Sequence, residues 1–522
     1  MEIVSGQIKG LIEWSRESIS QASSGLWEGG VRSSWKDLLT ESIRVAGVLR
    51  RAGIIADDVV SVQFPNGRQL VVLHLALARL GACVFPIHQN YGPLEVTSLL
   101  RRAGAVALIA RAGYHGRSRA EVLARVRDDC PQLRTVWSVE ADDTMARVAD
   151  APSTEDLQAT AGSVLAGPSA VLLLASSGTT STEPKICAHS YAALLDNAAT
   201  VAEDEHYGAS DTFLAAGPMS HAFGLSSLHL ALVCGGSLAT VDRWDPAAFL
   251  GTARVTGASV LMAVPAQLRD LVTLLRETGA PAPPGVREVR TGGAAVPPSL
   301  VADVVEVFGA QVVVQWGMTE VGIGCYTSGT AQSLHGGVGS PVPGAQLRIM
   351  RADGCVPRIG EVGELQIDTP FGFKGYVGAP ELTRAAHTDD GWIRTGDLAS
   401  LDIAGGVLLH GREDERINRG GLKFSAAEVE SLLADLPALH QYAVVPRPDP
   451  RLGERAVLVV SLRDGATVTL DEITAHLRGK GIALYKLPES LIVLDVVPTN
   501  AVGKVARVLV RGVVAALETA PA

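Results

Sequence analysis

Cysteine is scarce in this sequence and forms no recognisable metal or disulfide pattern. The 522 residues include six cysteines, scattered singly, without a CxxC pair or a Cys/His cluster at zinc spacing. They are Cys83, Cys130, Cys187, Cys234, Cys325 and Cys355. We therefore expect reduced, mostly buried thiols and neither a disulfide framework nor a zinc site.

An excess of positive charge is also absent. Lysine and arginine total 45 against 55 aspartates and glutamates, a net charge of -10, which argues against nucleic acid as the main partner. Met1 to Glu17 shows no basic segment followed by an apolar one, so no signal peptide is expected. The apolar run Leu70 to Leu80 is interrupted by Arg79, well short of the roughly 18 residues of a membrane span. These absences predict a soluble cytoplasmic protein without a membrane partner.

The composition that is present is that of a large folded enzyme. Hydrophobic residues make up 47% and charged residues 19% of the chain, enough to build a substantial core. The length suggests about three units of roughly 150 residues each. No internal repeat is seen.

Helical and strand periodicities alternate in the first part of the chain. Trp35 to Ala52 and Gln69 to Leu80 have helical spacing, whereas Val59 to Phe64 and Ala82 to Ile87 are rich in strand formers. Further short strands are predicted at Ala170–Leu174, Val260–Val264, Val286–Arg290 and Val312–Gln315. This rhythm predicts a parallel sheet with helices on both faces and ligands at the strand ends.

After about Gly336 the pattern changes to strands separated by glycine and proline, which predicts an antiparallel β subdomain. A charged segment, Gly411 to Arg416, then precedes a compact α+β region. We expect an α/β fold with a large N-terminal domain of parallel-rich sheets between helices, a β subdomain, and a small α+β C-terminal domain. The predicted boundaries are residues 1–411, a hinge at 412–415, and 416–522.

The most distinctive local segment runs from Ser176 to Lys185 and consists largely of small hydroxyl residues and glycine. It follows the strand Val171–Leu174 and precedes a helix expected to start near Tyr191. Backbone N–H and side-chain O–H groups in such a segment can converge on phosphate oxygens, with Lys185 adding a cation. The GxxxxGK[ST] spacing of P-loop proteins is absent. The segment is interpreted as a phosphate-binding loop, and a flexible surface linker is the alternative.

Several further segments occur in a fixed order, and together they resemble the adenylate-forming superfamily, which includes acyl- and aryl-CoA synthetases, peptide-synthetase adenylation domains and firefly luciferase. The segments are Ser176–Lys185, Pro218–His221, Gly292–Ala294, Gln315–Glu320, Arg394–Asp397, Gly411–Arg412, Arg419–Gly421 and Pro498–Lys504. The resemblance covers about Trp35 to Arg507. It implies ATP-dependent activation of a carboxylic acid to an acyl-AMP, with ATP and Mg²⁺ required and coenzyme A as a second substrate.

The resemblance implies roles for individual residues. Glu320 would provide the oxygen ligand that Mg²⁺ prefers, Trp316 would either stack on adenine or pack in the core, and Asp397 would accept the ribose hydroxyls, within a turn. The implied ATP- or AMP-binding set is Ser176, Ser177, Gly178, Thr179, Thr180, Lys185, Gly293, Ala294, Gln315, Trp316, Gly317, Met318, Thr319, Asp397 and Arg412.

Lys504 carries the central catalytic expectation. It follows Gly503 and a turn-prone Pro498-Thr499-Asn500 run, so it should lie on a loop. Its cation would stabilise the charge that builds on the α-phosphate during attack by the substrate carboxylate. The implied catalytic set is Lys504, Thr180, Glu320 and His221.

A lysine on a small separate domain must move away when the second nucleophile arrives, which gives a chemical reason for a hinge. By resemblance, Asp414 is the hinge residue. Gly420, Gly421 and Lys423 would face the acyl-adenylate during thioester formation. Leu422 is an unusual neighbour for this glycine pair.

The residues expected around the acid are small and uncharged. The predicted set is His221, Ala222, Phe223, Gly224, Leu225, Gly292, Gly317, Val321 and Gly322. No aspartate is present to hold an α-ammonium group, so an amino acid is disfavoured. Ala222 stands where family members that bind an ortho-hydroxyl have asparagine, which disfavours an ortho-hydroxybenzoate. An apolar aromatic, alicyclic or terpenoid acid is expected, and His221 would either gate the pocket or pack in the core.

Some features depart from the family pattern, and alternatives stay open. The phosphate-loop segment has one extra residue before Pro184, and Ser181 stands where glycine is commonest. The acyl group could pass to a separate carrier protein instead of coenzyme A, and a homodimer is one option for the assembly. A role in secondary metabolism is expected. A non-catalytic adenylate-binding protein and a luciferase-like oxidative enzyme are the competing classes.

Overall fold

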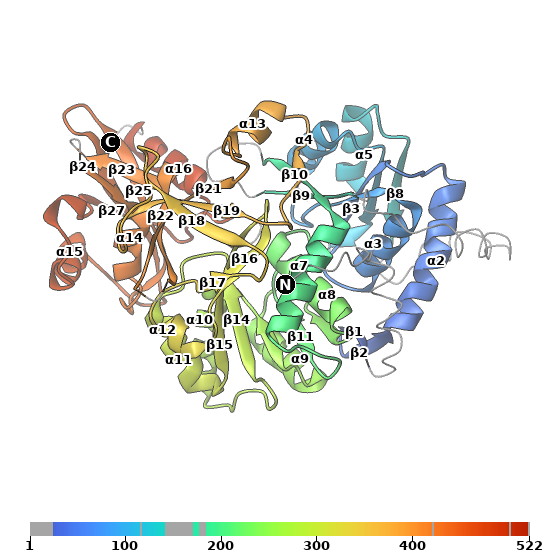
Figure 1. The fold of residues 1–522 in the computed structure, drawn as a ribbon, viewed down its shortest axis with the longest axis horizontal. Coiled ribbons are helices and arrows are strands. Elements are labelled where there is room, and N and C mark those ends of the chain that lie inside the picture. Colours follow the sequence, from blue (N-terminus) through green and yellow to red (C-terminus); the bar gives the residue numbers. More distant parts are fainter. Residues whose placement is uncertain are drawn as a thin grey trace.

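The structure is a computed structural model, and it describes residues 24–114, 117–118, 120–140, 171–176, 184–403, 405–419, 422–500 and 503–519. Figure 1 shows two large sheets with their helices, a smaller antiparallel sheet beside them, and the C-terminal elements gathered at one side. No helix in these ranges is both long and apolar enough to cross a membrane.

A seven-stranded sheet with order β20-β10-β9-β4-β3-β5-β8 forms the first half of the large domain. Its strands β3, β4, β5, β8 and β9 run parallel, whereas β10 and β20 are antiparallel additions. The bounds are β3 Val59–Gln63, β4 Cys83–Pro86, β5 Ala107–Arg111, β8 Thr135–Val139, β9 Val171–Ala175, β10 Ile186–Ser190 and β20 Gly375–Tyr376. The helices before β10 are α2 Trp35–Arg51, α3 Arg68–Leu80, α4 Pro93–Ala103 and α5 Ala120–Asp129, and β6 Gly113–Tyr114 pairs with β7 Arg117–Ser118.

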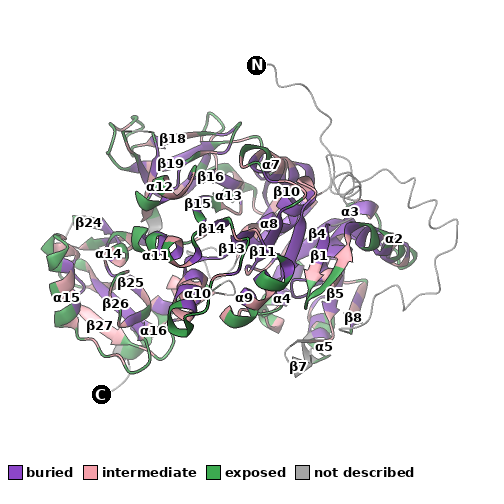
Figure 2. Ribbon diagram, turned by 90° about the horizontal axis from the view of Figure 1, so that it is seen from below, coloured by how far each residue is buried: buried purple, intermediate pink, exposed green. Residues whose placement is uncertain are grey.

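Both faces of this sheet are covered. Alternate residues of its strand β9 therefore belong to two different hydrophobic cores. Leu172 and Leu174 of β9 belong to the main core, whereas Leu173 and Ala175 belong to a second core with α4 and α5. Side chains alternate between the two faces of a strand, so a sheet buried on both sides needs the continuous apolar run that β9 has. Figure 2 shows such buried strands between helices with exposed outer faces.

The second large sheet has nine strands in the order β17-β16-β15-β14-β13-β11-β12-β1-β2, with a parallel centre from β1 to β15. The bounds are β1 Gly25–Glu28, β2 Val31–Ser34, β11 Thr212–Ala215, β12 Ser237–Thr240, β13 Val260–Met262, β14 Glu288–Gly292, β15 Gln311–Met318, β16 Gly322–Tyr326 and β17 Ser340–Pro341. The associated helices are α7 Tyr191–Asp204, α8 Ala222–Val233, α9 Pro246–Thr256, α10 Pro265–Thr278, α11 Pro298–Phe308 and α12 Thr330–Leu334. Helices α3, α7 and α8 share one core with both sheets.

Local sequence explains where these helices begin and end. In α9, Asp245 accepts a hydrogen bond from the Ala248 N–H at 2.7 Å, and Pro246 occupies the first helical position. Gly257 then ends the helix in a left-handed conformation with φ 62°. An acidic N-cap, an N-terminal proline and a C-terminal glycine satisfy the groups that a helix leaves unpaired at its ends.

The antiparallel β subdomain and the C-terminal region follow. The subdomain has strands β18 Gln346–Met350, β19 Gly363–Asp368, β21 Ile393–Leu401 and β22 Val407–Arg412, with α13 Pro380–Ala385 between them in sequence. The C-terminal elements are η2 Glu413–Glu415, β23 Arg416–Arg419, β24 Leu422–Ser425, α14 Ala426–Leu432, β25 Leu439–Asp449, β26 Gly453–Leu462, α15 Leu470–Gly479, η3 Leu484–Lys486, β27 Ser490–Val493 and α16 Arg507–Thr519. Their five-stranded sheet carries two cores of its own.

The predicted fold class is confirmed, with one local correction. The helix expected near Tyr191 is α7, which begins at that residue; strand β10, which was not predicted, lies between it and the phosphate-loop segment and pairs antiparallel with β9. Asp397 was expected in a turn, but it lies within β21 and pairs with Arg412 of β22. Gly396, directly before Asp397 in this strand, has a φ of 70°, a left-handed conformation that favours glycine. The predicted start of the C-terminal domain at residue 416 coincides with the start of β23, whereas β22 extends one residue past 411, to Arg412, and the domain limits stay a prediction.

Candidate active site

The ends of three parallel strands bring the predicted segments to one edge of the nine-stranded sheet. Strand β11 is followed by Pro218–His221, β14 by Gly293 and Ala294, and β15 by Thr319 and Glu320. The carboxyl ends of adjacent parallel strands share an edge, and open α/β sheets bind ligands there. Segments far apart in the sequence thereby lie along the same edge of the sheet. The expected position of Glu320 directly after a strand is confirmed, since β15 ends at Met318.

Asp397 lies between two donors that were predicted to bind the nucleotide with it. Its Oδ2 accepts from Trp316 Nε1 at 2.7 Å, and its Oδ1 accepts from Arg412 Nη1 at 3.0 Å. Trp316 is buried, and a Cβ on Gly324 would lie 2.4 Å from its ring, so part of the indole packs tightly against the Gly324 backbone. The packing interpretation thus agrees with the position of the ring. The stacking of adenine on it stays a prediction.

Lys504 of the C-terminal region reaches this same group of residues. A Cβ on Gly293 would lie 3.2 Å from both Cε and Nζ of Lys504. Burial lowers the pKa of Lys504, Asp397 opposes that shift, and Arg412 adds to it. Lys504 precedes α16 and its N–H donates to Asn500 Oδ1 at 3.0 Å, so the predicted loop position is confirmed. The Lys504 side chain therefore lies against Gly293, where the nucleotide is predicted to bind.

Glu320 and Lys185 meet at Tyr376, a residue that the sequence patterns did not single out. Tyr376 donates its hydroxyl hydrogen to Glu320 Oε1 at 2.7 Å, and Lys185 Nζ lies 5.0 Å from the centre of the same ring. Burial and the adjacent Glu320 raise the pKa of Tyr376. At the base of the phosphate-loop segment, Ser176 N–H donates to Lys185 O at 2.8 Å.

The chemistry of this donor set fits a magnesium ion held jointly with a nucleotide. Within the described residues no group of three or more His, Cys, Asp or Glu side chains could hold a metal by itself. Glu320 is buried and offers a hard oxygen ligand beside the predicted phosphate site. Mg²⁺ is typically held by one or two carboxylates together with phosphate oxygens and water. The single carboxylate agrees with that arrangement, and Glu320 stays the predicted ligand.

Part of the predicted acid-binding set lies at the start of α8, namely His221, Ala222, Phe223, Gly224 and Leu225. His221 is its N-cap residue, and its ring centre lies 5.8 Å from that of His88. Burial lowers the pKa of His221 to about 3, with His88 and Lys504 contributing, so its imidazole is neutral. Its buried Nε2 has no hydrogen-bond partner within the described structure. His221 therefore lies beside Lys504 in an uncharged state.

Close backbone contacts explain the glycines of the predicted acid pocket. A Cβ on Gly224 would lie 2.2 Å from Pro218 O, and one on Gly317 would lie 2.1 Å from Gly322 O. Gly292 approaches Gln315 O equally closely. These positions exclude any larger side chain. Ala222 and Phe223 are half-buried, Leu225 and Val321 are fully buried, and none of them carries charge.

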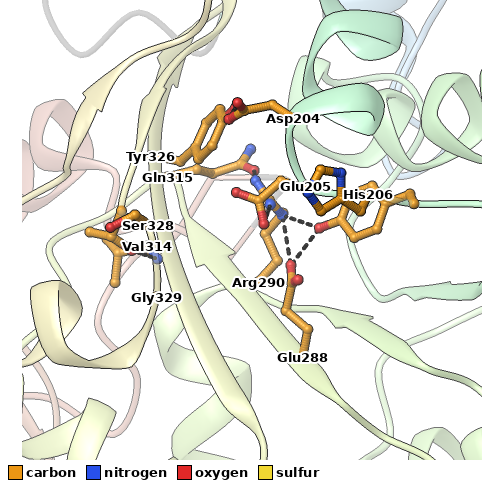
Figure 3. A network of polar contacts seen from close by, with 12 residues as sticks. Asp204, Glu205, His206, Glu288, Arg290, Val314, Gln315, Tyr326, Ser328 and Gly329 are labelled. Atoms are coloured by element: carbon orange, nitrogen blue, oxygen red, sulfur yellow. Dashed lines mark hydrogen bonds and ion pairs between the residues drawn. The ribbon is translucent and has the colours of Figure 1, made fainter.

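Gln315 faces a buried polar network beneath this edge of the sheet (Figure 3). Arg290 Nη1 donates to Gln315 Oε1 at 3.3 Å, and Arg290 Nε donates to Glu288 Oε1 and Tyr207 Oη, each at 3.0 Å. Glu205 lies 3.4 Å from Arg290 Nη2. Arg290 is completely buried, so its charge is balanced by these carboxylates rather than by water. The network braces β14 and β15 where they lead into Gly293 and Glu320.

Several predicted residues lie outside the described ranges: Ser177, Gly178, Thr179, Thr180, Gly420 and Gly421. Asp414 is placed in η2 and Lys423 in β24. Ala294 is exposed, whereas Met318 and Thr319 are half-buried. The roles assigned to all of these residues stay predictions.

Two residues of the site were missed by the sequence analysis, Tyr376 and His88. Tyr376 follows Lys374 and Gly375 in a segment that was not assigned to any site. His88 follows a predicted strand end, which is a usable signal in an open α/β sheet. The pairing of β20 with β10, more than 180 residues away, brings Tyr376 to Glu320, and no local pattern indicates it.

Comparisons with known proteins agree with this geometry. The family model of the AMP-binding enzymes matches residues 17–377, and that of the AMP-binding enzyme C-terminal domain matches residues 428–504. The chain is 32% identical over 505 residues to a salicylyl-CoA synthase/salicylate adenylyltransferase of a Streptomyces species, covering 93% of this chain and 90% of that protein. It is 29% identical over 508 residues to a feruloyl-CoA synthase of an Amycolatopsis species, covering 96% and 99%.

A solved structure shares the whole fold. The anthranilate CoA ligase AuaEII in complex with anthranoyl-AMP superposes with a TM-score of 0.87 at 20% identity, over 99% of this chain and 100% of that one. The family matches cover both the large domain and the C-terminal region that carries Lys504. The chain belongs to the AMP-binding enzymes, the adenylate-forming superfamily of AMP-forming acid:CoA ligases and acid-adenylating enzymes.

Proposed function

We propose that this enzyme activates an apolar carboxylic acid, of aromatic, alicyclic or terpenoid type, to an acyl-AMP and then transfers the acyl group to coenzyme A. The observation that carries the proposal is the position of Lys504, whose side chain lies against Gly293 beside the Asp397–Arg412 pair. A cation at this place suits a reaction in which negative charge builds on a phosphate.

In the first step the substrate carboxylate attacks the α-phosphorus of ATP, and pyrophosphate leaves. Asp397 holds the ribose hydroxyls while Trp316 and Arg412 fix the orientation of its carboxylate. Lys504 stabilises the charge on the α-phosphate oxygens, and Lys185 faces the departing phosphates. Mg²⁺, held by Glu320 together with phosphate oxygens, would neutralise phosphate charge.

The acid is proposed from the chemistry of the residues around α8. His221 is neutral, and Ala222, Leu225 and Val321 are uncharged, which suits an apolar body. The relatives named for salicylate and ferulate act on aromatic acids. Ala222 offers no group for an ortho-hydroxyl, so salicylate itself is not the proposed acid. A hydrophobic wall discriminates between acids by only about 1–3 kcal/mol per methylene, so a related series of acids should react.

In the second step the thiol of coenzyme A takes the acyl group and AMP leaves; coenzyme A is proposed by analogy with the named relatives. The principal alternative is transfer to a separate carrier protein, which would use the same adenylation site. A non-catalytic adenylate-binding protein is the alternative of another class, and the combination of Lys504, Glu320 and Asp397 disfavours it.

Acid-dependent exchange of labelled pyrophosphate into ATP, measured over a panel of aromatic, alicyclic and diterpenoid acids, tests the proposal. Active acids are then incubated with ATP and coenzyme A, and thioesters are detected by mass spectrometry. We expect exchange with several apolar acids and a thioester from each. Exchange without thioester would favour a carrier protein, and no exchange with any acid would refute adenylation.

A further inference from the structure

Tyr376 is held firmly at the edge of the seven-stranded sheet. It lies in β20, opposite Cys187 of β10, and its backbone N–H donates to Thr383 Oγ1 at 2.9 Å. Its ring packs edge-on against Phe373 at 4.9 Å between centres, and 9% of the residue is exposed. The side chain therefore has a fixed direction before any ligand binds.

The hydroxyl of this ring restrains Glu320. An ionised carboxylate can only accept, so Tyr376 donates to Glu320 Oε1, at 2.7 Å. The Glu320 carbonyl accepts from the Phe373 N–H at 2.8 Å, so the segment around Tyr376 holds both the backbone and the side chain of Glu320. With one oxygen fixed, the direction of the second carboxylate oxygen is also set.

The face of the same ring attracts a second group of the site. Lys185 Nζ lies 5.0 Å from the ring centre, within the range of a cation–π contact. Lys185 directly precedes β10 and ends the predicted phosphate-loop segment. One aromatic side chain thus contacts both the predicted metal ligand and the predicted phosphate cation.

We propose that Tyr376 is a positioning residue for nucleotide binding, with its hydroxyl orienting Glu320 for the magnesium ion and its ring holding Lys185 for the phosphates. The proposal rests on the proposed function, in which Glu320 and Lys185 have these roles. It goes beyond that function because it assigns two separable tasks to two parts of one side chain. Groups that orient metal ligands usually change metal affinity or activity by about 10- to 100-fold when removed.

Two substitutions separate the two tasks. Tyr376→Phe keeps the ring and removes only the hydroxyl, whereas Tyr376→Leu removes both. The matched control is Tyr326→Phe, which removes another hydroxyl that donates to a carboxylate, Asp204 Oδ2 at 2.5 Å, without touching Glu320.

The readout is binding rather than turnover. The dissociation constant of an ATP analogue with a methylene bridge between the α- and β-phosphates is measured by calorimetry with and without Mg²⁺. For Tyr376→Phe we expect unchanged affinity without metal and a loss of about 10- to 100-fold in the tightening that Mg²⁺ causes. Tyr376→Leu should in addition bind the analogue more weakly without metal, because Lys185 loses its cation–π contact with the aromatic ring.

The outcomes are distinguishable. Mg²⁺ could lower the dissociation constant of the analogue by the same factor in Tyr376→Phe, in Tyr326→Phe and in the wild type. That result would refute the proposal that the Tyr376 hydroxyl orients Glu320. An equal loss in Tyr326→Phe would also refute it, because the effect would then be a general one of losing a buried hydroxyl. If wild-type enzyme binds the analogue without any effect of Mg²⁺, the metal role of Glu320 in the proposed function fails instead. Unchanged metal-free affinity in Tyr376→Phe verifies that the variant is folded.

Discussion

Replacing Asp397 by asparagine should weaken adenylation strongly while leaving the fold intact. The side chain keeps its shape, so the contact with Trp316 can persist, but the negative charge opposite Arg412 and Lys504 is lost. Hydrogen bonds to charged groups contribute about 1.5–3 kcal/mol. At about 1.4 kcal/mol per factor of ten, kcat/KM for ATP should fall roughly 10- to 100-fold.

The same substitution should change the pH dependence in a defined direction. Burial lowers the pKa of Lys504, the Asp397 carboxylate raises it again, and Arg412 lowers it. Without the carboxylate the pKa of Lys504 falls further, so the ammonium group loses its proton at a lower pH. The alkaline limb of the kcat/KM profile should therefore move to lower pH in Asp397→Asn.

The assay is pyrophosphate exchange from pH 6 to 10 with an active acid, alongside thermal unfolding. Asp390→Asn serves as the control, since Asp390 also pairs with an arginine, Arg348, at 2.6 Å but is exposed. The control should keep both its rate and its profile. An Asp397→Asn enzyme within twofold of the wild type, with an unmoved alkaline limb, would contradict the reasoning about this carboxylate.

Two further predictions concern stability and the acid pocket. Arg290→Met removes the nearest cation from buried Glu288 and half-buried Glu205 and leaves only Arg287, at 3.8 Å, beside Glu288. The free energy of unfolding, measured with denaturant, should fall by about 3–5 kcal/mol. Breaking the exposed pair of Arg276 by Arg276→Ala should lower it by less than about 1 kcal/mol. Gly224→Ala places a Cβ 2.2 Å from the backbone oxygen of Pro218, close to His221. The KM for the acid should therefore rise, and the midpoint of thermal unfolding should fall. An unchanged KM would show that this segment does not line the acid site.

The order of strands, helices and loops follows from local patterns in the sequence. The apolar run of β9, buried on both faces, and the strand ends before Gly293 and Glu320 are readable because burial and turn chemistry act on neighbouring residues. The motif order also placed Lys504 at the nucleotide, and its contact with Gly293 agrees with that prediction.

The parts that could not be predicted depend on pairing between distant strands. Asp397 was expected in a turn because Arg394–Asp397 resembles the ribose-binding turn of the family, yet the pairing of β21 with β22 holds it in a strand beside Arg412. Tyr376 reaches Glu320 only through the pairing of β20 with β10. The network around Arg290 joins the end of α7 to β14 and β15, and isolated polar residues in a sequence do not reveal such partners.

The most direct test of the account is the exchange rate of Lys504→Ala with an acid that the wild type activates. Removing one preorganised donor to the developing charge should lower adenylation at least roughly 10²-fold, or about 3 kcal/mol. Lys480→Ala, which removes a lysine of the same region paired with Asp435, should exchange at the wild-type rate. A Lys504→Ala enzyme that exchanges pyrophosphate as fast as the Lys480→Ala control would contradict the assignment of Lys504 to acyl-AMP formation.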